Sequence, residues 1–359
     1  MCKVWAITDL QYGSSGKGFV TSLLSFHPKV KMVIRTGAPQ AGHTAVVCGN
    51  RYVGRSIPIG RVNKNVLLLY GPGGVVSLET LKSELNDTPY SVVNRFFIHE
   101  NAVIVTETDK EKEKESITTG STFEGIGQAR SRRAIRKATT IKLLLEIDGG
   151  NYNWLKQFVI DDNEYFNLIE SVDGVILLEG HQGFGLSNWF GQYPYVTSVD
   201  TTVMANMSEA GLNPFMLQKV YGVMRTYEIR IAGNSGPLKR ELKWDDIPTH
   251  PDPEFTTVTK KVRRIANVDW NLVKKAVMVN GVTDICITHA DYFENNQEIH
   301  NFAMSVLAHT RRYDPKISLI NRNSDISKIV ETSDLGCMSQ EFLDAFNQFN
   351  ISRNIFEGV

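Results

Sequence analysis

The glycine-rich segment at residues 9–18 is the stretch of this chain best suited to bind an anion. It reads Asp-Leu-Gln-Tyr-Gly-Ser-Ser-Gly-Lys-Gly, and it joins an apolar strand pattern at residues 4–7 to an amphipathic helix pattern. Backbone N–H groups and the helix dipole favour a phosphate at such a turn, and Lys17 adds a positive charge. The standard phosphate loop, G-x-x-x-x-G-K-[ST], is not matched, because Gln11 and Gly18 occupy two of its positions. A glycine-rich turn without a ligand is the alternative interpretation.

A second segment whose residues could take part in catalysis covers residues 35–44. It reads Arg-Thr-Gly-Ala-Pro-Gln-Ala-Gly-His-Thr and follows an apolar run at residues 30–34. His43 lies between a glycine and a threonine, so we expect it on a loop. Histidine is suited to acid–base work because its pKa lies near neutral pH. A surface histidine without a catalytic role is the alternative.

Together the two segments resemble adenylosuccinate synthetase, whose members carry G-D-E-G-K-G and N-A-G-H-T at this separation. The resemblance is strongest at residues 179–183, Glu-Gly-His-Gln-Gly, and at residues 193–198, Tyr-Pro-Tyr-Val-Thr-Ser. The family reads E-G-A-Q-G and Y-P-Y-V-T-S there. Shorter matches occur at residues 56–60, 71–77, 120–122 and 125–127. The motifs follow one another in register from about residue 3 to about residue 330.

The resemblance implies an NTP-dependent carbon–nitrogen ligase that needs Mg2+. The γ-phosphoryl group moves to O6 of a 6-oxopurine nucleotide, and the amine of aspartate then displaces it. The implied catalytic residues are Ser14, His43 and Gln182, with Ser14 and the Gly42 carbonyl as metal ligands. The implied ligands of the triphosphate are Gly13, Ser15, Gly16, Lys17, Gly18, Gly42, His43 and Thr44.

The purine monophosphate needs a phosphate site of its own. By resemblance its ligands are Ser14, Gln40, Ser121, Thr122, Arg136, Gln182 and Thr197. Arg136 falls on the family arginine that reaches this phosphate from the partner subunit, which implies a homodimer with shared sites. It belongs to a basic run at residues 130–137, for which a solvent-exposed face and a nucleic-acid patch are alternatives.

The aspartate and the NTP base have their own expected segments. The resemblance assigns aspartate to Thr257, Thr259, Lys261 and Arg263, and the NTP base to His289, Asp291 and Asn321. Phe123-Glu124 replaces a family arginine, and a glutamate there would repel aspartate. The guanine-reading segment is altered at His289 and around Asn321, which favours ATP or dATP over GTP.

Ser14 is the largest departure from the family, which carries there the aspartate that binds metal and removes the purine N1 proton. Ser14 is a poor base, but a small hydroxyl leaves room for a 2-amino group, and therefore for guanine instead of hypoxanthine. A phage-borne branch, the 2-aminoadenylosuccinate synthetases, converts dGMP, aspartate and ATP to N6-succino-2-amino-2′-deoxyadenylate for diaminopurine DNA. We predict this activity. The alternatives are an ordinary synthetase using IMP and GTP, and a nucleotide-binding protein without catalysis.

Composition narrows the class of protein. Lysine plus arginine and aspartate plus glutamate both number 39, giving zero formal net charge, which argues against a dedicated nucleic-acid binder. The 4 cysteines are far apart and favour a reducing compartment. No apolar run is long enough to span a membrane, and no signal peptide is visible. We expect a cytoplasmic protein, in the host cytoplasm if the chain is phage-encoded.

Strand and helix patterns alternate along the chain. This predicts an α/β fold with a mainly parallel sheet flanked by helices, P-loop-NTPase-like, as a single domain over residues 1–359 with inserted loops and subdomains. We expect strands at residues 30–35, 66–70, 102–105, 174–178, 219–224, 284–288 and 317–320. We expect helices at residues 16–26, 77–86, 139–147, 269–279, 298–309 and 339–347, and a solvated helix or mobile loop at 107–115. Ligands in such folds bind at the carboxyl ends of the strands.

Overall fold

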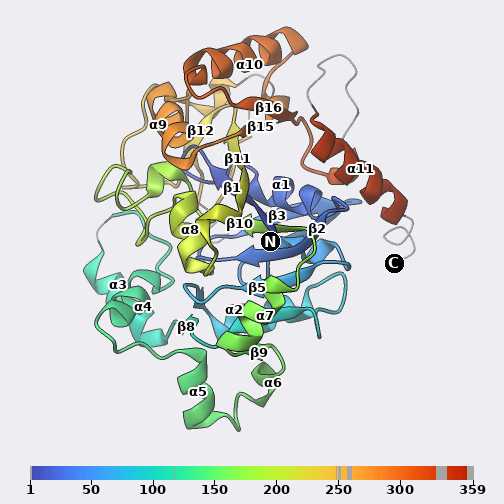
Figure 1. Ribbon diagram of the computed structural model, residues 1–359. Helices are drawn as coiled ribbons and strands as arrows, with labels where there is room; N and C mark the ends of the chain where they lie inside the picture. The colour runs from blue at the N-terminus through green and yellow to red at the C-terminus, as the bar shows by residue number, and fades with distance from the viewer. Residues whose placement is uncertain are drawn as a thin grey trace.

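The computed structural model describes residues 2–117, 119–247, 249, 252–256, 261–328 and 338–353. Its centre is a nine-stranded sheet in the order β16-β15-β11-β1-β10-β2-β5-β7-β9, in which every pairing is parallel (Figure 1). In chain order these strands are β1 Lys3–Asp9, β2 Val30–Arg35, β5 Leu67–Tyr70, β7 Phe96–His99, β9 Val159–Ile160, β10 Val175–Glu179, β11 Leu217–Arg225, β15 Asp284–Thr288 and β16 Lys316–Ile320.

The sheet is buried on both faces because side chains of β1 alternate between two apolar clusters. Trp5 and Ile7 pack in a cluster with α1 (Lys17–Leu24) and α11 (Gln340–Arg353). Val4 and Ala6 pack in the other, with α8 (Val203–Glu209), α9 (Trp270–Asn280) and α10 (Asn296–Thr310). Strands covered on both faces read as nearly continuous apolar runs, as the wholly buried β10 does.

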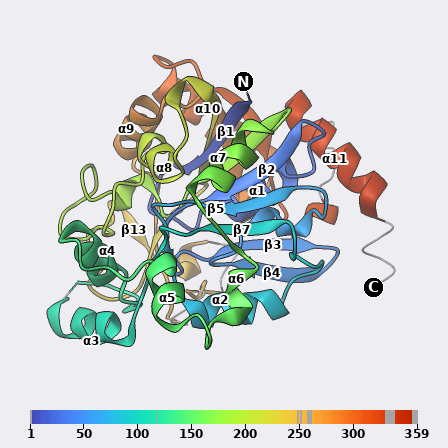
Figure 2. The same cartoon turned by 60° about the horizontal axis from the view of Figure 1, so that its bottom comes forward.

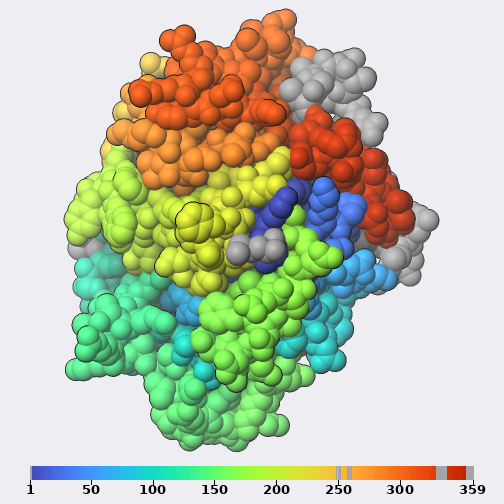
Figure 3. Space-filling model, viewed as in Figure 1, coloured from blue at the N-terminus to red at the C-terminus, as the bar shows by residue number. Residues whose placement is uncertain are grey.

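The remaining helices pack on both faces of the sheet and, through a separate apolar cluster, beside it. They are α2 (Leu78–Asn86), α3 (Glu107–Ser116), α4 (Ile126–Ala134), α5 (Ile141–Asp148), α6 (Asn153–Lys156) and α7 (Asp162–Glu170). Figure 2 shows α3 and α4 side by side, where the ion pair between Asp109 and Arg132 joins them. Helix α11 packs beside the N-terminal segment (Figure 3), with Phe349 against Phe26 at a ring-centroid distance of 5.1 Å.

Three small sheets sit around the large one. The hairpin β3 (His43–Val47) and β4 (Asn50–Gly54) is antiparallel. Strands β12 (Glu228–Arg230), β14 (Arg264–Ala266) and β13 (Glu241–Leu242) form a second sheet, and β6 (Val75–Val76) pairs with β8 (Val103–Ile104). Each of these small sheets belongs to segments that leave the carboxyl ends of strands in the large sheet. They therefore lie around that edge of the large sheet.

The predicted fold class is confirmed, and every predicted strand and helix is present, although α11 runs to Arg353 instead of ending at residue 347 and β8 lies outside the large sheet. Two expectations are wrong in part. His43 is the first residue of β3, not a loop residue. The charged run is helix α3, as one of the alternatives had it, but Asp109 and Glu113 in it are buried. Among the described residues, no helix is both long and apolar enough to cross a membrane.

Candidate active site

A cavity of about 780 Å³ opens at the carboxyl ends of β1, β10 and β15. Most of the predicted site residues line it, although they come from segments far apart in the chain. The lining includes Gly13, Ser14, Ser15, Gly16, Lys17, Gly18, Gln40, Gly42, His43, Thr44, Ser121, Thr122, Gln182, Thr197, Arg263, His289, Asp291 and Asn321. Thr257 and Thr259 lie outside the described residues. The topology therefore brings the predicted subsites for three substrates into one cleft.

The glycine-rich loop owes its shape to left-handed backbone positions at Gly13, Ser14 and Gly16, whose φ angles are 89°, 56° and 88°. Gly18 explains the departure from the standard loop. A Cβ there would lie 2.4 Å from the backbone oxygen of Thr44, so a hydroxyl-bearing residue does not fit against β3. The loop is consequently packed on the segment that carries His43.

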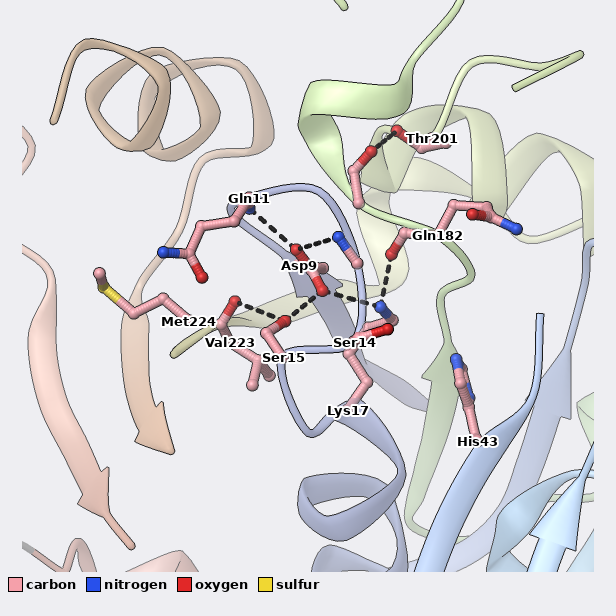
Figure 4. A network of polar contacts seen from close by, with 12 residues as sticks. Asp9, Gln11, Ser14, Ser15, Lys17, His43, Gln182, Thr201, Val223 and Met224 are labelled. Carbon is pink, nitrogen blue, oxygen red and sulfur yellow. Dashed lines mark hydrogen bonds and ion pairs between the residues drawn. The ribbon is translucent and has the colours of Figure 1, made fainter. Parts of the chain in front are cut away.

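Asp9 is a site residue that the sequence interpretation missed. Its buried carboxylate accepts hydrogen bonds from the backbone N–H groups of Gln11, at 2.8 Å, and Gly13, at 3.2 Å, and from the hydroxyl of Ser15. It also forms an ion pair with Lys17, Nζ to Oδ2 3.1 Å (Figure 4). An acidic residue at the end of the strand before the loop was the available signal. Asp9 thus orders the loop and neutralises its lysine.

Lys17 joins the loop to the segment after β10. Its ammonium group donates both to Asp9 and to the backbone carbonyl of Gln182, which holds a left-handed φ of 55°. In Figure 4 the lysine lies between the loop and Gln182, and His43 lies on the same side of the lysine as Gln182. Lys17 therefore holds together the two segments that the resemblance assigns to the phosphates and to the purine.

His43 belongs to a buried triad with Arg35 and Glu179. Nδ1 of His43 lies 2.5 Å from Oε1 of Glu179, and the guanidinium of Arg35 bonds the same carboxylate. Burial, aided by the charge of Arg35, lowers the pKa of His43 to about 4. The ring is therefore neutral at pH 7, with its Nδ1 proton donated to Glu179. The remaining nitrogen, Nε2, is the atom left for a ligand.

Glu179, like Asp9, is a site residue to which the sequence assigned no function, although it belongs to the segment at residues 179–183 that resembles the family. Burial by itself raises its pKa, but Arg35, His43 and the backbone N–H of Ile59 together outweigh burial and hold the pKa below the usual range. Its other oxygen accepts from the backbone N–H of Ile59 at 2.8 Å. The carboxylate therefore fixes both the orientation and the tautomer of His43.

The far end of the cleft carries the expected monophosphate ligands Ser121, Thr122 and Thr197. Glu124 does not face this cleft, contrary to the expected repulsion of aspartate. Its carboxylate pairs with Arg55 at 3.0 Å instead. Arg136 is exposed and is absent from the lining of its own chain's cleft.

The aspartate-loop residue Arg263 lies beside a carboxylate that the sequence did not suggest. Its Nε is 3.8 Å from Oε2 of Glu254, and Glu254 also binds Arg225 and the hydroxyl of Tyr292. Burial raises the pKa of Glu254, but Arg225, His289 and the hydroxyl of Tyr292 together outweigh burial and hold the carboxylate ionised. Arg225 in turn donates to the carbonyl of Ser14 at 3.3 Å, which links this end to the phosphate loop. Lys261 is exposed and lines a smaller neighbouring cavity of about 150 Å³.

The expected base-binding residues lie at the β15 end of the cleft. Asp291 is exposed to it, so its carboxylate can accept from an exocyclic amine. Asn321 donates to the carbonyl of Asn323 at 2.6 Å and begins a series of turns. That series ends at Asp325, which accepts from the backbone N–H of Gly49 at 2.8 Å. The base-binding end is thus tied to the hairpin that begins with His43.

The donor set fits a magnesium ion held mainly by phosphates. Ser14 and the Gly42 carbonyl line the cleft, but the described residues contain no cluster of three or more histidine, cysteine or acidic side chains suited to a metal. Mg2+ bound to nucleotides keeps several waters and takes few protein ligands. When bound, the ion neutralises charge on the transferred phosphoryl group.

A parallel sheet with a glycine-rich turn and a polar cleft at its carboxyl edge defines a nucleotide-binding α/β protein. A family model described as adenylosuccinate synthetase matches residues 6–153 and 150–305. The chain belongs to the adenylosuccinate synthetase family. It is therefore an NTP-dependent ligase that forms carbon–nitrogen bonds.

Relatives of two kinds resemble the chain. The adenylosuccinate synthetase of Methanococcus vannielii is 34% identical over 291 residues, covering 79% of this chain and 83% of the relative. That of Thermococcus sibiricus is 30% identical over 290 residues, with the same coverage. The structure of cyanophage S-2L succinoaminodeoxyadenylate synthetase (PurZ), bound to dGMP and to dATP as an energy donor, has a TM-score of 0.82 and 25% identity. The match covers 97% of this chain and 99% of the PurZ chain. Fully ligated adenylosuccinate synthetase from Plasmodium falciparum, at TM-score 0.77 and 20% identity, shares the fold.

Proposed function

We propose that this chain joins L-aspartate to C6 of dGMP with ATP or dATP, giving N6-succino-2-amino-2′-deoxyadenylate. The observation that carries the proposal is Ser14, which faces the cleft where ordinary family members have an aspartate. A serine there adds no negative charge and leaves space at the C2 edge of the purine. The nearly full-length similarity to a structure that binds dGMP and dATP supports this choice.

The first half-reaction forms a bond between purine O6 and the γ-phosphorus and breaks the bond to the leaving nucleoside diphosphate. In this proposal, the loop N–H groups and Lys17 bind the triphosphate, and Gln182 holds the 6-phosphoryl group. His43 faces the leaving diphosphate through Nε2. Because the diphosphate is anionic, its approach favours protonation of a ring that is neutral in the empty cleft.

The second half-reaction forms the bond between the aspartate nitrogen and C6 and expels inorganic phosphate. Arg263 supplies a fork that suits a carboxylate of aspartate, as arginine does elsewhere. Glu254 shares that arginine in the empty cleft, so aspartate and Glu254 compete for it. Asp291 would accept from the N6 amine of the adenine base of ATP or dATP.

The substrate prediction is tested with purified protein, Mg2+, aspartate and each monophosphate in turn. We expect phosphate release with dGMP and ATP or dATP, little with IMP, and none when aspartate is left out. Ser14→Asp should lower turnover with dGMP by at least tenfold, because a carboxylate against the 2-amino edge takes back space. Ser208→Asp, which adds the same charge at an exposed position outside the lining of the cleft, is the control.

Three outcomes would contradict parts of this proposal. Faster turnover with IMP would make the chain an ordinary synthetase, as its archaeal relatives are named. Strict dependence on GTP would show that Asp291 alone reads guanine. Binding of nucleotides without any phosphate release would leave a nucleotide-binding protein without catalysis.

We also propose a homodimer with shared active sites, in which Arg136 serves the partner's monophosphate. Its position outside its own cleft supports this arrangement. Arg136→Ala should weaken binding of dGMP by about 1.5–3 kcal/mol, as for one hydrogen bond to a charged group, with little change in the KM for ATP. The neighbouring exposed Lys137→Ala is the control.

Mixing the weakly binding Arg136→Ala variant with the His43→Ala variant, at a dGMP concentration too low to saturate Arg136→Ala, tests whether the sites are shared. A dimer of one Arg136→Ala chain and one His43→Ala chain contains one site with neither defect, so activity should partly return. If subunits exchange and no activity returns, Arg136 acts within its own chain or only at the surface.

A further inference from the structure

Glu113 is an inward-facing acidic residue in helix α3, in which Asp109 is the other buried acidic residue. Only 6% of its surface is exposed, whereas its α3 neighbours Glu111, Lys112, Lys114 and Glu115 are exposed. The carboxylate lines the monophosphate end of the cleft. Its hydrogen-bond partners among the described residues, Ser121 and Gly125, are both neutral, although burying a charge away from a cation is costly. A residue placed at such a cost calls for a reason beyond packing.

One of the two hydrogen bonds of Glu113 uses a group that an anionic ligand in the cleft would need. Oε1 accepts from the hydroxyl of Ser121 at 3.2 Å, and Oε2 accepts from the backbone N–H of Gly125. Ser121 is an expected ligand of the 5′-phosphate, and Gly125 is the N-cap of helix α4, which has no cap from its own side chains. Glu113 thus supplies negative charge at the place where the phosphate is expected.

Each of these donors has a single proton. A serine hydroxyl donates one hydrogen bond and a backbone N–H donates one. Ser121, which lines the cleft, cannot give that proton to Glu113 and to a phosphate oxygen at the same time, whereas Gly125 is buried outside the lining. A phosphate that takes the bond of Ser121 must therefore release the carboxylate, and the two negative charges repel one another while they are close.

We propose that the carboxylate of Glu113 takes the place of the 5′-phosphate in the empty enzyme. It accepts the hydrogen bond that the Ser121 hydroxyl would give to the monophosphate, and it must be displaced when the nucleotide binds. This inference rests on the proposed function, because it takes Ser121 as a ligand of the purine monophosphate. It makes Glu113 a determinant of monophosphate affinity. When the nucleotide binds, either helix α3 moves or the side chain of Glu113 turns away.

The test compares Glu113→Gln with Glu115→Gln, which removes the same charge from an exposed position of the same helix. Affinities for dGMP, IMP and deoxyguanosine are measured by calorimetry without triphosphate. We expect Glu113→Gln to bind dGMP on the order of tenfold more tightly, because the repulsion is gone and an amide can donate to phosphate. Deoxyguanosine, which lacks the phosphate, should bind both variants and the wild type alike.

A double-mutant cycle with Ser121→Ala identifies the contested donor. Without the serine hydroxyl, Glu113→Gln should tighten dGMP binding by a smaller factor than it does in the wild-type background. If Glu113 only supports the loop, Glu113→Gln will lower the melting temperature and weaken dGMP binding, and the inference is wrong. Unchanged dGMP affinity, or equal tightening for deoxyguanosine, would also overturn it. If the wild type binds neither dGMP nor IMP, the proposed function is wrong, and this inference, which depends on it, is wrong as well.

Discussion

Replacement of His43 by alanine is expected to lower kcat by about 100- to 10,000-fold, the usual contribution of general acid catalysis, while KM for the substrates changes much less. The reason is geometric. The bond from Nδ1 to Glu179 leaves Nε2 for a ligand, and in the proposed reaction Nε2 meets the diphosphate as negative charge develops. That interaction is stronger in the transition state than in the bound substrate, so its loss appears in kcat.

The measurement is steady-state kinetics at saturating Mg-nucleotide and aspartate. His300→Ala, at an exposed position of α10, is the control and should be silent. A fall in kcat smaller than about tenfold would return His43 to a structural role. A large rise in KM with kcat unchanged would make it a residue of uniform substrate binding.

Replacement of Glu179 by glutamine is expected to cost about 3–5 kcal/mol of folding free energy, the second large effect. Arg35 is completely buried and depends on this carboxylate, so the variant leaves a buried guanidinium without its counter-ion. Urea unfolding of the two proteins measures the difference. Glu170→Gln, at an exposed position, should change stability by less than about 0.5 kcal/mol. A loss below about 1 kcal/mol for Glu179→Gln would contradict the buried triad.

The pH dependence of stability follows from the same triad. The pKa of Glu179 is lower in the folded protein, so its contribution is complete above the unfolded value of about 4.3 and is lost as the pH falls through the folded value. The pKa of His43 is also lowered, to about 4, so the unfolded chain binds its proton first as the pH falls from about 6.5. Both groups therefore weaken the fold in acid. The stability gap between wild type and Glu179→Gln should shrink below about pH 4.

The sequence by itself determined the framework and most members of the cleft. Alternating apolar patterns predicted the parallel sheet, because strands covered on both faces must be apolar throughout. The glycine-rich loop and the segment of His43 each follow a predicted strand, and parallel strands end at one common edge. The roles of His43 and Gln182 came from the resemblance to the family motifs, not from local chemistry alone.

Only the tertiary structure decided which charges face each other. Glu179 meets His43 across 136 residues of sequence, and Arg225 meets Glu254 because β11 and the loop before β14 are neighbours in space. Glu124 looked like a repulsive charge in the cleft until its pairing with Arg55 was seen. Glu113 looked like one more solvated charge of a helix whose other face happens to meet the cleft. Charges are neutralised by partners that the chain topology supplies, and local patterns carry no information about partners so distant in sequence.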